Sequence, residues 1–325
     1  MRKTLFLFLF TCALVSLIGK PEGLAQTPLQ KVPISTSSPG IFSIDLFIAQ
    51  DRGFFREEGL DLQLIQMRAS TAIAAGISGN VDALGSIGSA IRAIQRGAPL
   101  RVVAVTLRRP LFWLVARPEY RSVKELKGKV LGVVTIGGSQ HTTAKRLLSL
   151  GGLDPDKDLT TVQIGDEGTQ LQALVSNAIQ VAAIGPPFFL IGRDNYKMNV
   201  LDSSVDKFTS IQNGLAVNVR ALQEKPELVK KILRARAKAN RYFHESEKGT
   251  SEILAHRSKT DLAVALETYR LSKPAFTTNG IPTEKEMKEY LALDAQILKL
   301  PEPVDPSTVF DFSLQRDVNH ELGIR

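Results

Sequence analysis

Short apolar runs alternate with longer amphipathic segments along most of the chain. The runs have the length and composition of strands and cover 31–35, 60–64, 81–84, 100–106, 112–116, 128–134, 161–164, 179–184 and 214–219. The segments between them carry apolar residues at helical spacing and cover 42–58, 71–78, 89–96, 139–150, 168–177 and 187–195. Strands that alternate with helices in this way favour an α/β fold with largely parallel sheets.

The end of the chain has a different pattern. After the strand at 214–219, the sequence predicts mainly helices, at 226–243, 261–271 and 283–298. Basic and acidic residues are mixed on their polar faces, as is typical of helices that contact water. We therefore expect a helical C-terminal tail on the α/β part.

Two segments far apart in the chain resemble each other. Residues 71–81 and 169–179 each contain a helix, then a serine followed by glycine or asparagine, then the start of a strand. The similarity indicates either two related halves or the local layout that any strand–helix–strand unit has.

The N-terminus has the three parts of a secretory signal peptide. Arg2 and Lys3 precede an apolar run, and Gly23 and Ala25 provide small residues for cleavage. The run covers about 15 residues at 5–19, fewer than the roughly 20 that a membrane-spanning helix needs. We therefore expect a signal peptide at 1–25, cleaved near Ala25, and a periplasmic mature protein.

Composition narrows the possible functions. Cys12 is the only cysteine and lies in the leader, so the mature chain can form no disulfide and has no thiol chemistry. The net charge of +8 falls to +6 without the leader, with 38 basic and 32 acidic residues. Because these charges are mixed on helices, the sequence argues against a nucleic-acid-binding surface. A weak positive field would still favour anionic ligands.

Three turns each follow a predicted strand and open a predicted helix. They are Ser86-Ile87-Gly88-Ser89, Gly137-Gly138-Ser139-Gln140-His141 and Gly185-Pro186-Pro187. A helix start exposes free backbone N–H groups, and the carboxyl ends of strands are favoured ligand sites in α/β sheets. Simple helix capping by serine is the alternative for each single turn. Three such turns together predict a ligand-binding cleft.

Motifs for chemistry are weak. Gly137-Gly138-Ser139-Gln140-His141 has histidine where a G-x-S-x-G nucleophile turn needs its last glycine. His141, His244, His256 and His320 lack the spacing of metal ligands. The sequence contains no G-x-G-x-x-G, P-loop or H-E-x-x-H motif. We therefore expect no enzyme activity, no metal and no cofactor.

Several sequence blocks together resemble one family. They cover 52–60 (RGFFREEGL), 78–82 (SGNVD), 96–100, 126–133, 153–158 and the Pro186-Pro187 pair. In this order they are similar to the solute-binding proteins of nitrate/sulfonate/taurine-type ABC importers. The resemblance extends over 32–214 and fades in the C-terminal tail.

The resemblance implies a two-lobed periplasmic binding protein of type II, each lobe being a mixed, mostly parallel sheet flanked by helices. Lobe 1 would contain 27–115 and 214–325, and lobe 2 would contain 116–213. The expected ligand contacts are Ser37, Ser38, Phe42, Arg68, Ser86, Ser89, Gly138, Ser139, Gln140, His141 and Pro186. The implied partners are a small-molecule ligand and an ABC permease with its ATPase at the inner membrane, with no nucleic acid. We expect a monomer.

The identity of the ligand does not follow from the resemblance. Serine hydroxyls, helix N-termini and a positive net charge favour a small organic anion, and an uncharged heteroaromatic compound is the alternative. A lyase or dehydratase on the same fold, or a sensor that presents its ligand to a membrane receptor, are the alternative functions. The export signal argues against a cytoplasmic enzyme.

Overall fold

The computed structural model describes residues 28–37, 40–205 and 207–325. The predicted signal peptide and Ser38 lie outside these residues. Within them, no helix is both long and apolar enough to cross a bilayer.

Ten strands of the described chain form two five-stranded sheets. The first has the order β2-β1-β3-β10-β4 and consists of β1 (Gln30–Thr36), β2 (Leu60–Gln66), β3 (Ala83–Ser86), β4 (Leu100–Leu107) and β10 (Asn213–Asn218). The second has the order β7-β6-β8-β5-β9 and consists of β5 (Trp113–Ala116), β6 (Lys129–Val133), β7 (Leu159–Gln163), β8 (Val181–Ile184) and β9 (Asn199–Ser203). The strand–helix alternation predicted from the sequence is confirmed.

The two sheets have the same internal arrangement. In the first, β1 pairs in parallel with β2 and β3, and β10 runs antiparallel to β3. In the second, β6 pairs in parallel with β7 and β8, and β5 runs antiparallel to β8. The similar segments 71–81 and 169–179 lead into β3 and β8, which hold equivalent places. This supports the interpretation as two related halves.

The chain crosses between the sheets twice. It leaves the first sheet after β4 and enters the second at β5, and it returns from β9 to β10. Trp113, Leu114 and Val115, which the prediction assigned to the end of lobe 1, pair with β8 in the second sheet. The lobe boundaries stay a prediction, and this pairing favours a first crossing at 108–112.

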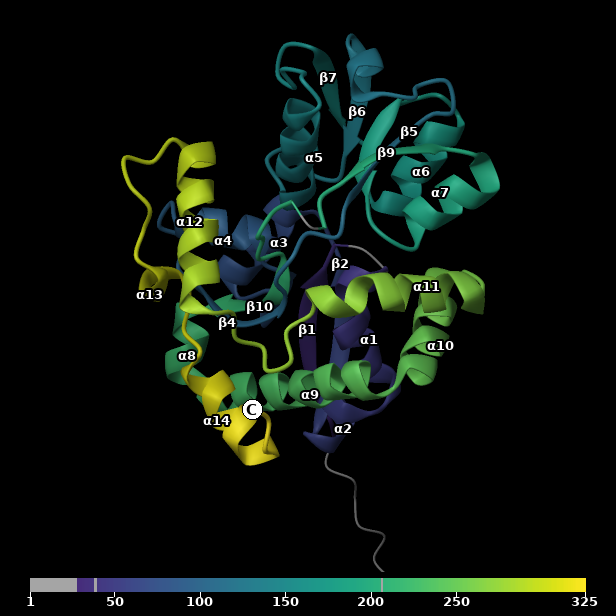
Figure 1. Cartoon of the computed structure of the whole chain (residues 1–325). Coiled ribbons are helices and arrows are strands. Elements are labelled where there is room, and N and C mark those ends of the chain that lie inside the picture. The colour runs from purple at the N-terminus through teal and green to yellow at the C-terminus, as the bar shows by residue number, and fades with distance from the viewer. Residues whose placement is uncertain (1–27, 38–39, 206) are drawn as a thin grey trace, which may run out of the picture.

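Helices flank both sheets, as Figure 1 shows. Those beside the first sheet are the 3-10 helix η1 (Ile41–Ser43), α1 (Ile44–Asp51), α2 (Phe54–Glu57), α3 (Ala69–Ser78) and α4 (Gly88–Ile94). Those beside the second are η2 (Val123–Leu126), α5 (Ser139–Leu150), α6 (Glu167–Val175) and α7 (Phe188–Tyr196). The single helix predicted at 42–58 is wrong in one respect. Gly53 adopts a left-handed φ of 77°, which ends α1 and turns the chain into α2.

The predicted C-terminal helices are present and belong to the body around the first sheet. They are α8 (Val219–Glu224), α9 (Pro226–Glu245), α10 (Glu247–Ser258), α11 (Leu262–Ser272), η3 (Lys273–Ala275), α12 (Glu284–Leu298), α13 (Pro306–Val309) and α14 (Ser313–Leu322). In Figure 1, α9 runs across the lower body and α12 stands beside α4. The apolar face of α9 buries Val229, Ile232 and Leu233 in the core. Its Arg236 forms a buried ion pair with Asp45 of α1.

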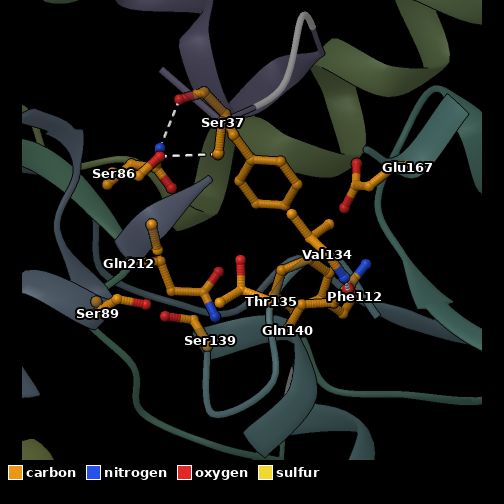
Figure 2. A pocket seen from close by; sticks show the side chains of 15 residues that line it. Ser37, Ser86, Ser89, Phe112, Val134, Thr135, Ser139, Gln140, Glu167 and Gln212 are labelled. Atoms are coloured by element: carbon orange, nitrogen blue, oxygen red, sulfur yellow. Dashed lines mark hydrogen bonds between the residues drawn. The ribbon is translucent and has the colours of Figure 1, made fainter. Parts of the chain in front are cut away.

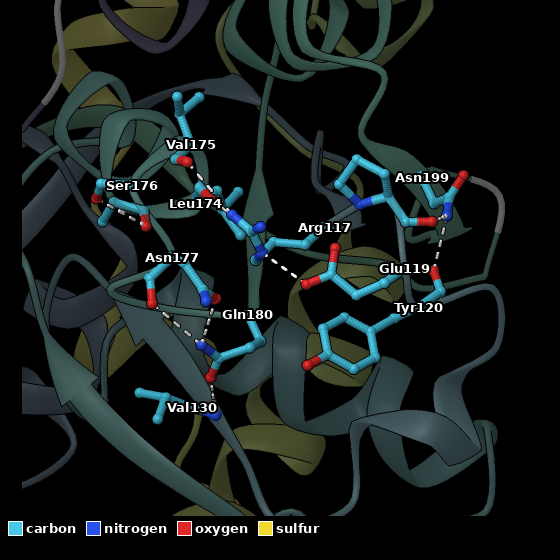
Figure 3. A network of polar contacts seen from close by, with 12 residues as sticks. Arg117, Glu119, Tyr120, Val130, Leu174, Val175, Ser176, Asn177, Gln180 and Asn199 are labelled. Carbon is cyan, nitrogen blue, oxygen red and sulfur yellow. Dashed lines mark hydrogen bonds and ion pairs between the residues drawn. The ribbon is translucent and has the colours of Figure 1, made fainter.

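A polar network fixes the strand that enters the second sheet. Arg117 follows β5, and its Nη1 donates to the carbonyl of Leu174 at 2.7 Å, near the end of α6 (Figure 3). Its Nε donates to Glu119 Oε1 at 2.8 Å. Asn199 of β9 donates to the carbonyls of Pro118 and Tyr120 at 2.9 and 2.8 Å. Because helix ends leave carbonyls unpaired, Arg117 caps α6 and anchors it to β5.

Candidate functional site

A cleft lies between the two sheets, at the ends of their strands. The empty volume of the cleft is about 610 Å³, and part of this volume is open to solvent. Its walls come from both sheets and from both crossings of the chain. The lining residues are Ser37, Phe42, Ala69, Ser86, Gly88, Ser89, Phe112, Val134, Thr135, Gly138, Ser139, Gln140, Glu167, Gln212 and Asn213.

Serines from the first sheet form one wall. Ser37 follows β1 and Ser86 ends β3, and because these parallel strands are neighbours their hydroxyls meet at 2.8 Å. Ser89 lies one residue inside α4. In Figure 2 these three serines lie on one side of the cleft, with Ser139 and Gln212 near them and Glu167 on the other side.

The turn before α5 forms the facing wall. Gly137 has a left-handed φ of 79°, which lets the chain turn from β6 into the helix. Gly138 and Ser139 then border the cleft. Gln140 also borders it, but its amide is held by the protein. Its Oε1 accepts from the N–H of Val134 at 2.7 Å, and its Nε2 donates to Gln170 at 3.0 Å.

The two walls touch each other beside the cleft. A Cβ placed on Gly88 would lie 1.9 Å from Ser139 Oγ, so glycine allows the close approach of α4 to α5. Arg92 of α4 donates to the carbonyl of Gly137 at 2.7 Å and to Thr142 Oγ1 at 3.0 Å. On the other side, Gln66 Nε2 donates to Asp166 Oδ2 at 3.0 Å. The structure therefore has the lobes in contact around the cleft.

Among the described residues that line the cleft, Glu167 is the one titratable residue. It is 2% exposed, and its Oε1 accepts from the N–H of Gly185 at 3.2 Å. Burial raises the pKa of the Glu167 carboxyl to about 8, against the weaker effect of the Gly185 N–H, and the nearby Asp166 raises it further. The carboxyl is therefore largely protonated at neutral pH.

Two phenylalanines give the cleft an apolar side. The rings of Phe42 and Phe112 lie 5.1 Å apart at an angle of 33°. Phe42 follows β1, and its backbone carbonyl accepts from Asn213 Nδ2 at 2.6 Å. Asn213 thereby ties the returning strand β10 to the apolar wall. The cleft suits a solute with an apolar or aromatic part and a polar edge.

Seven of the predicted contacts line the cleft together: Ser37, Phe42, Ser86, Ser89, Gly138, Ser139 and Gln140. Three others do not line it. Arg68 is exposed at the start of α3, and Pro186 is buried but does not belong to the lining residues. Ser38 lies outside the described residues.

His141 is the third predicted contact that does not line the cleft. It is buried, and its Nδ1 accepts from the N–H of Gly137 at 2.9 Å. Burial lowers the pKa of His141, and Lys145 lowers it further, so the imidazole is neutral and supports the turn. The contact of His141 with a ligand stays a prediction, and the structure shows its imidazole supporting the turn.

Several lining residues were not predicted. Gln212 and Asn213 come just before the predicted strand at 214–219, and Thr135 comes just after the strand at 128–134. Glu167 opens α6 after a strand and a glycine, Gly165, so it obeys the rule that selected the other three turns. Applying the rule to 164–168 as well would have found it.

No group of three histidine, cysteine, aspartate or glutamate residues in the described part of the chain could hold a metal ion. The groups of the lining residues that can contact a solute are hydroxyl, amide, carboxyl and aromatic groups.

Residues 43–248, more than half of the chain, match the NMT1/THI5-like family. The chain belongs to that family. The match covers both crossings and all of the second sheet, and therefore most of the cleft.

Curated relatives are more distant. The riboflavin-binding protein RibY of Chloroflexus aurantiacus is 29% identical over 228 residues, which is 66% of this chain and 63% of RibY. The binding protein YtlA of Bacillus subtilis is 27% identical over 168 residues, which is 50% of each chain. The matched part is thus less than two thirds of either relative.

Solved structures show the same fold across nearly the whole chain. The alkanesulfonate-binding protein SsuA of Xanthomonas axonopodis, bound to MOPS, has a TM-score of 0.71 at 16% identity, covering 90% of this chain and 98% of that one. The nitrate-binding protein NrtA of Synechocystis has a TM-score of 0.69 at 16% identity, covering 91% and 90%. NrtA is a periplasmic protein, and both structures share the periplasmic binding protein fold, so the predicted fold class is confirmed. One structure of similar fold, the desulfurization enzyme DSZB, is an enzyme, with a TM-score of 0.66 at 14% identity.

Proposed function

We propose that this protein is the extracytoplasmic solute-binding component of an ABC importer. It captures a small organic solute between its two lobes, outside the cytoplasmic membrane, and delivers it to the permease. The mature protein acts as a monomer after its signal peptide is removed.

The observation that carries the proposal is the cleft itself. Residues from three separate stretches of the chain, 37–42, 86–89 and 134–140, converge on it from two sheets of equal topology. Two lobes joined by two crossings can open and close as rigid bodies, which is how a solute is enclosed and released. The similar structures whose names state a bound solute, SsuA and NrtA, support the same use of the cleft.

An enzyme on this fold is less consistent with the site. The cleft contains serine hydroxyls, but none of the lining residues that the structure describes is a histidine or lysine that could activate them as nucleophiles. His141, the nearest candidate base in sequence, accepts a backbone N–H of Gly137 instead. These contacts favour binding over chemistry.

The charge of the solute stays a prediction. We expected an anion from the serines and the net charge, yet the described part of the cleft lining contains no lysine, arginine or histidine. The contacts of the described residues favour the uncharged alternative. The same cleft serves transport through a permease and its ATPase, or presentation of the solute to a membrane receptor.

A thermal-shift screen tests the proposal. Riboflavin, uracil, methanesulfonate, nitrate and aromatic acids would be added to the mature protein, because a solute that binds only the native state raises Tm. We expect at least one compound to raise Tm. A variant with both Ser86→Ala and Ser139→Ala should bind that compound more weakly by about 1–3 kcal/mol. An unchanged affinity in the double variant would place the solute elsewhere.

A matched control uses serines outside the cleft. Ser251 and Ser272 are fully buried in the C-terminal helices and do not line the cleft. A Ser251→Ala variant should leave solute affinity unchanged. Equal losses in both variants would show a general effect on folding rather than a contact with the solute.

A further inference from the structure

Two residues that line the cleft, from different parts of the chain, contain buried polar atoms without partners. Among the described residues, Glu167 Oε2 and both side-chain atoms of Gln212, Oε1 and Nε2, have no hydrogen-bond partner. Both residues line the cleft, and Gln212 is 4% exposed. Since buried polar groups are nearly always paired in native proteins, unpaired ones in a cleft indicate places that a ligand fills.

The surroundings of Glu167 are acidic or neutral. Asp166 precedes it on α6 and bonds Thr169 and Gln66. The group that bonds Glu167 itself is the backbone N–H of Gly185, after β8. Arg193 of α7, the helix packed on α6, is engaged by Asp194 and Glu267.

The described residues of α5, α6 and α7 that pack near Glu167 include two amides and an aromatic ring. Gln140 of α5 and Gln170 of α6 bond each other, and the ring of Phe188 lies beside Gly168. An ionised carboxylate with one hydrogen bond and no cation would be costly to bury, so the neutral acid is the stable form in the protein.

We propose that Glu167, held as the protonated acid, and Gln212 together select an uncharged solute. The inference rests on the proposed function. The Glu167 hydroxyl at Oε2 donates to an acceptor of the solute, such as a carbonyl oxygen or a ring nitrogen. The Gln212 amide offers a donor and an acceptor to the same polar edge, and Phe42 and Phe112 pack against the apolar part.

This assignment excludes two classes of solute. A sulfonate or nitrate would meet a carboxyl group and no cation among the lining residues, so burying its charge would be uncompensated. A cation would require Glu167 to ionise, against the burial that raises its pKa. The polar groups of the cleft are satisfied best by a neutral molecule.

Infrared spectroscopy tests the protonation of Glu167 without any solute. The difference spectrum between the wild-type protein and Glu167→Gln at pH 7 should contain the carbonyl band of a protonated carboxyl. The matched control is Glu125→Gln, because Glu125 is an exposed acid. Its difference spectrum should show the loss of a carboxylate only. An ionised Glu167 at pH 7 would overturn the inference.

Binding at several pH values tests the role of Glu167 in selection, with riboflavin and uracil as uncharged probes, methanesulfonate and nitrate as anions, and choline as a cation. With a pKa of about 8, roughly one tenth of the protein keeps the Glu167 proton at pH 9, so the affinity of an uncharged probe should be about tenfold lower there than well below pH 8. Glu167→Gln cannot ionise. The affinity of this variant for the uncharged probe should therefore not fall between pH 7 and pH 9. A second variant, Gln212→Leu, should bind the same probe about fivefold more weakly than the wild type.

The outcomes separate the inference from the proposed function. If an anion or a cation binds more tightly than the uncharged probes and Ser86→Ala with Ser139→Ala weakens it, solute binding stands and the selection by Glu167 is wrong. The same holds if Glu167→Gln keeps the pH dependence of the wild type. If no probe of any charge binds, both the proposed function and this inference are wrong.

Discussion

Arg92 makes a strong prediction because it joins three parts of the molecule. Its Nε donates to Asp294 Oδ1 of α12 at 3.0 Å, and its guanidinium also holds Gly137 and Thr142 beside the cleft. The side chains of Arg92 and Asp294 are 8% and 0% exposed. We predict that Arg92→Met lowers the free energy of unfolding by about 3–5 kcal/mol, since it leaves the Asp294 charge buried without its partner.

Urea unfolding followed by circular dichroism would measure this change. Fluorescence of Trp113, a tryptophan of β5, provides a second probe that reports on the other sheet. The transitions seen by circular dichroism and by fluorescence should both move to lower urea concentration, because Arg92 contacts residues beside both sheets. Transitions at different urea concentrations would show that the two lobes unfold separately, and each would then be fitted by itself.

Two controls make the prediction refutable. Arg270 pairs with Glu247 on the surface, where the side chains are 67% and 42% exposed, so Arg270→Met should cost less than about 1 kcal/mol. Adding Asp294→Leu to Arg92→Met removes the stranded charge and should restore much of the lost stability. A loss below about 1 kcal/mol in Arg92→Met, or a double variant no more stable than the single one, would refute the reasoning.

Three further predictions concern Glu167, the close contact of the lobes and export. The folded protein keeps the Glu167 proton up to about pH 8, whereas the unfolded chain releases it near 4.5, so the contribution of Glu167 to stability should be largest below pH 4.5 and should fall by up to about 5 kcal/mol as pH rises to 8. The difference in unfolding free energy between the wild type and Glu167→Gln should change with pH in this way, and a difference that is the same at pH 5 and pH 8 would contradict it. Gly88→Ala places a methyl group against Ser139 Oγ and should weaken a bound solute about fivefold in calorimetry, with Gly249→Ala, which places a methyl group against Tyr242 Oη outside the cleft, as the matched control. N-terminal sequencing of protein from the periplasm should begin near Gln26, and an intact Met1 would remove the support for export.

Much of the cleft could be predicted because it depends on local pattern. Ser86, Ser89 and Ser139 lie where a strand ends and a helix begins, and sequence periodicity finds such places. Parallel pairing then brings the ends of neighbouring strands together, as it does for Ser37 and Ser86. The same alternation predicted the α/β fold, whereas the order of the strands in each sheet depends on pairing between distant segments.

Other features depend on contacts that no local pattern contains. Asp294 meets Arg92 across about 200 residues of sequence, so the part that the C-terminal tail plays beside the cleft could not be inferred. His141 was predicted to face the ligand because of its position in the turn, but its side chain bends back to the N–H of Gly137. The unpaired Oε2 of Glu167 became visible only when the burial of its neighbours was known.

Small-angle X-ray scattering tests the central claim, that the two lobes close on a solute, most directly. The mature protein would be measured with and without the probe that raises Tm most, beside the variant carrying Ser86→Ala and Ser139→Ala at the same probe concentration. We predict a smaller radius of gyration with the probe, a change that saturates with binding, and less compaction in the variant. A radius of gyration that is the same with and without saturating probe would contradict closure of the lobes.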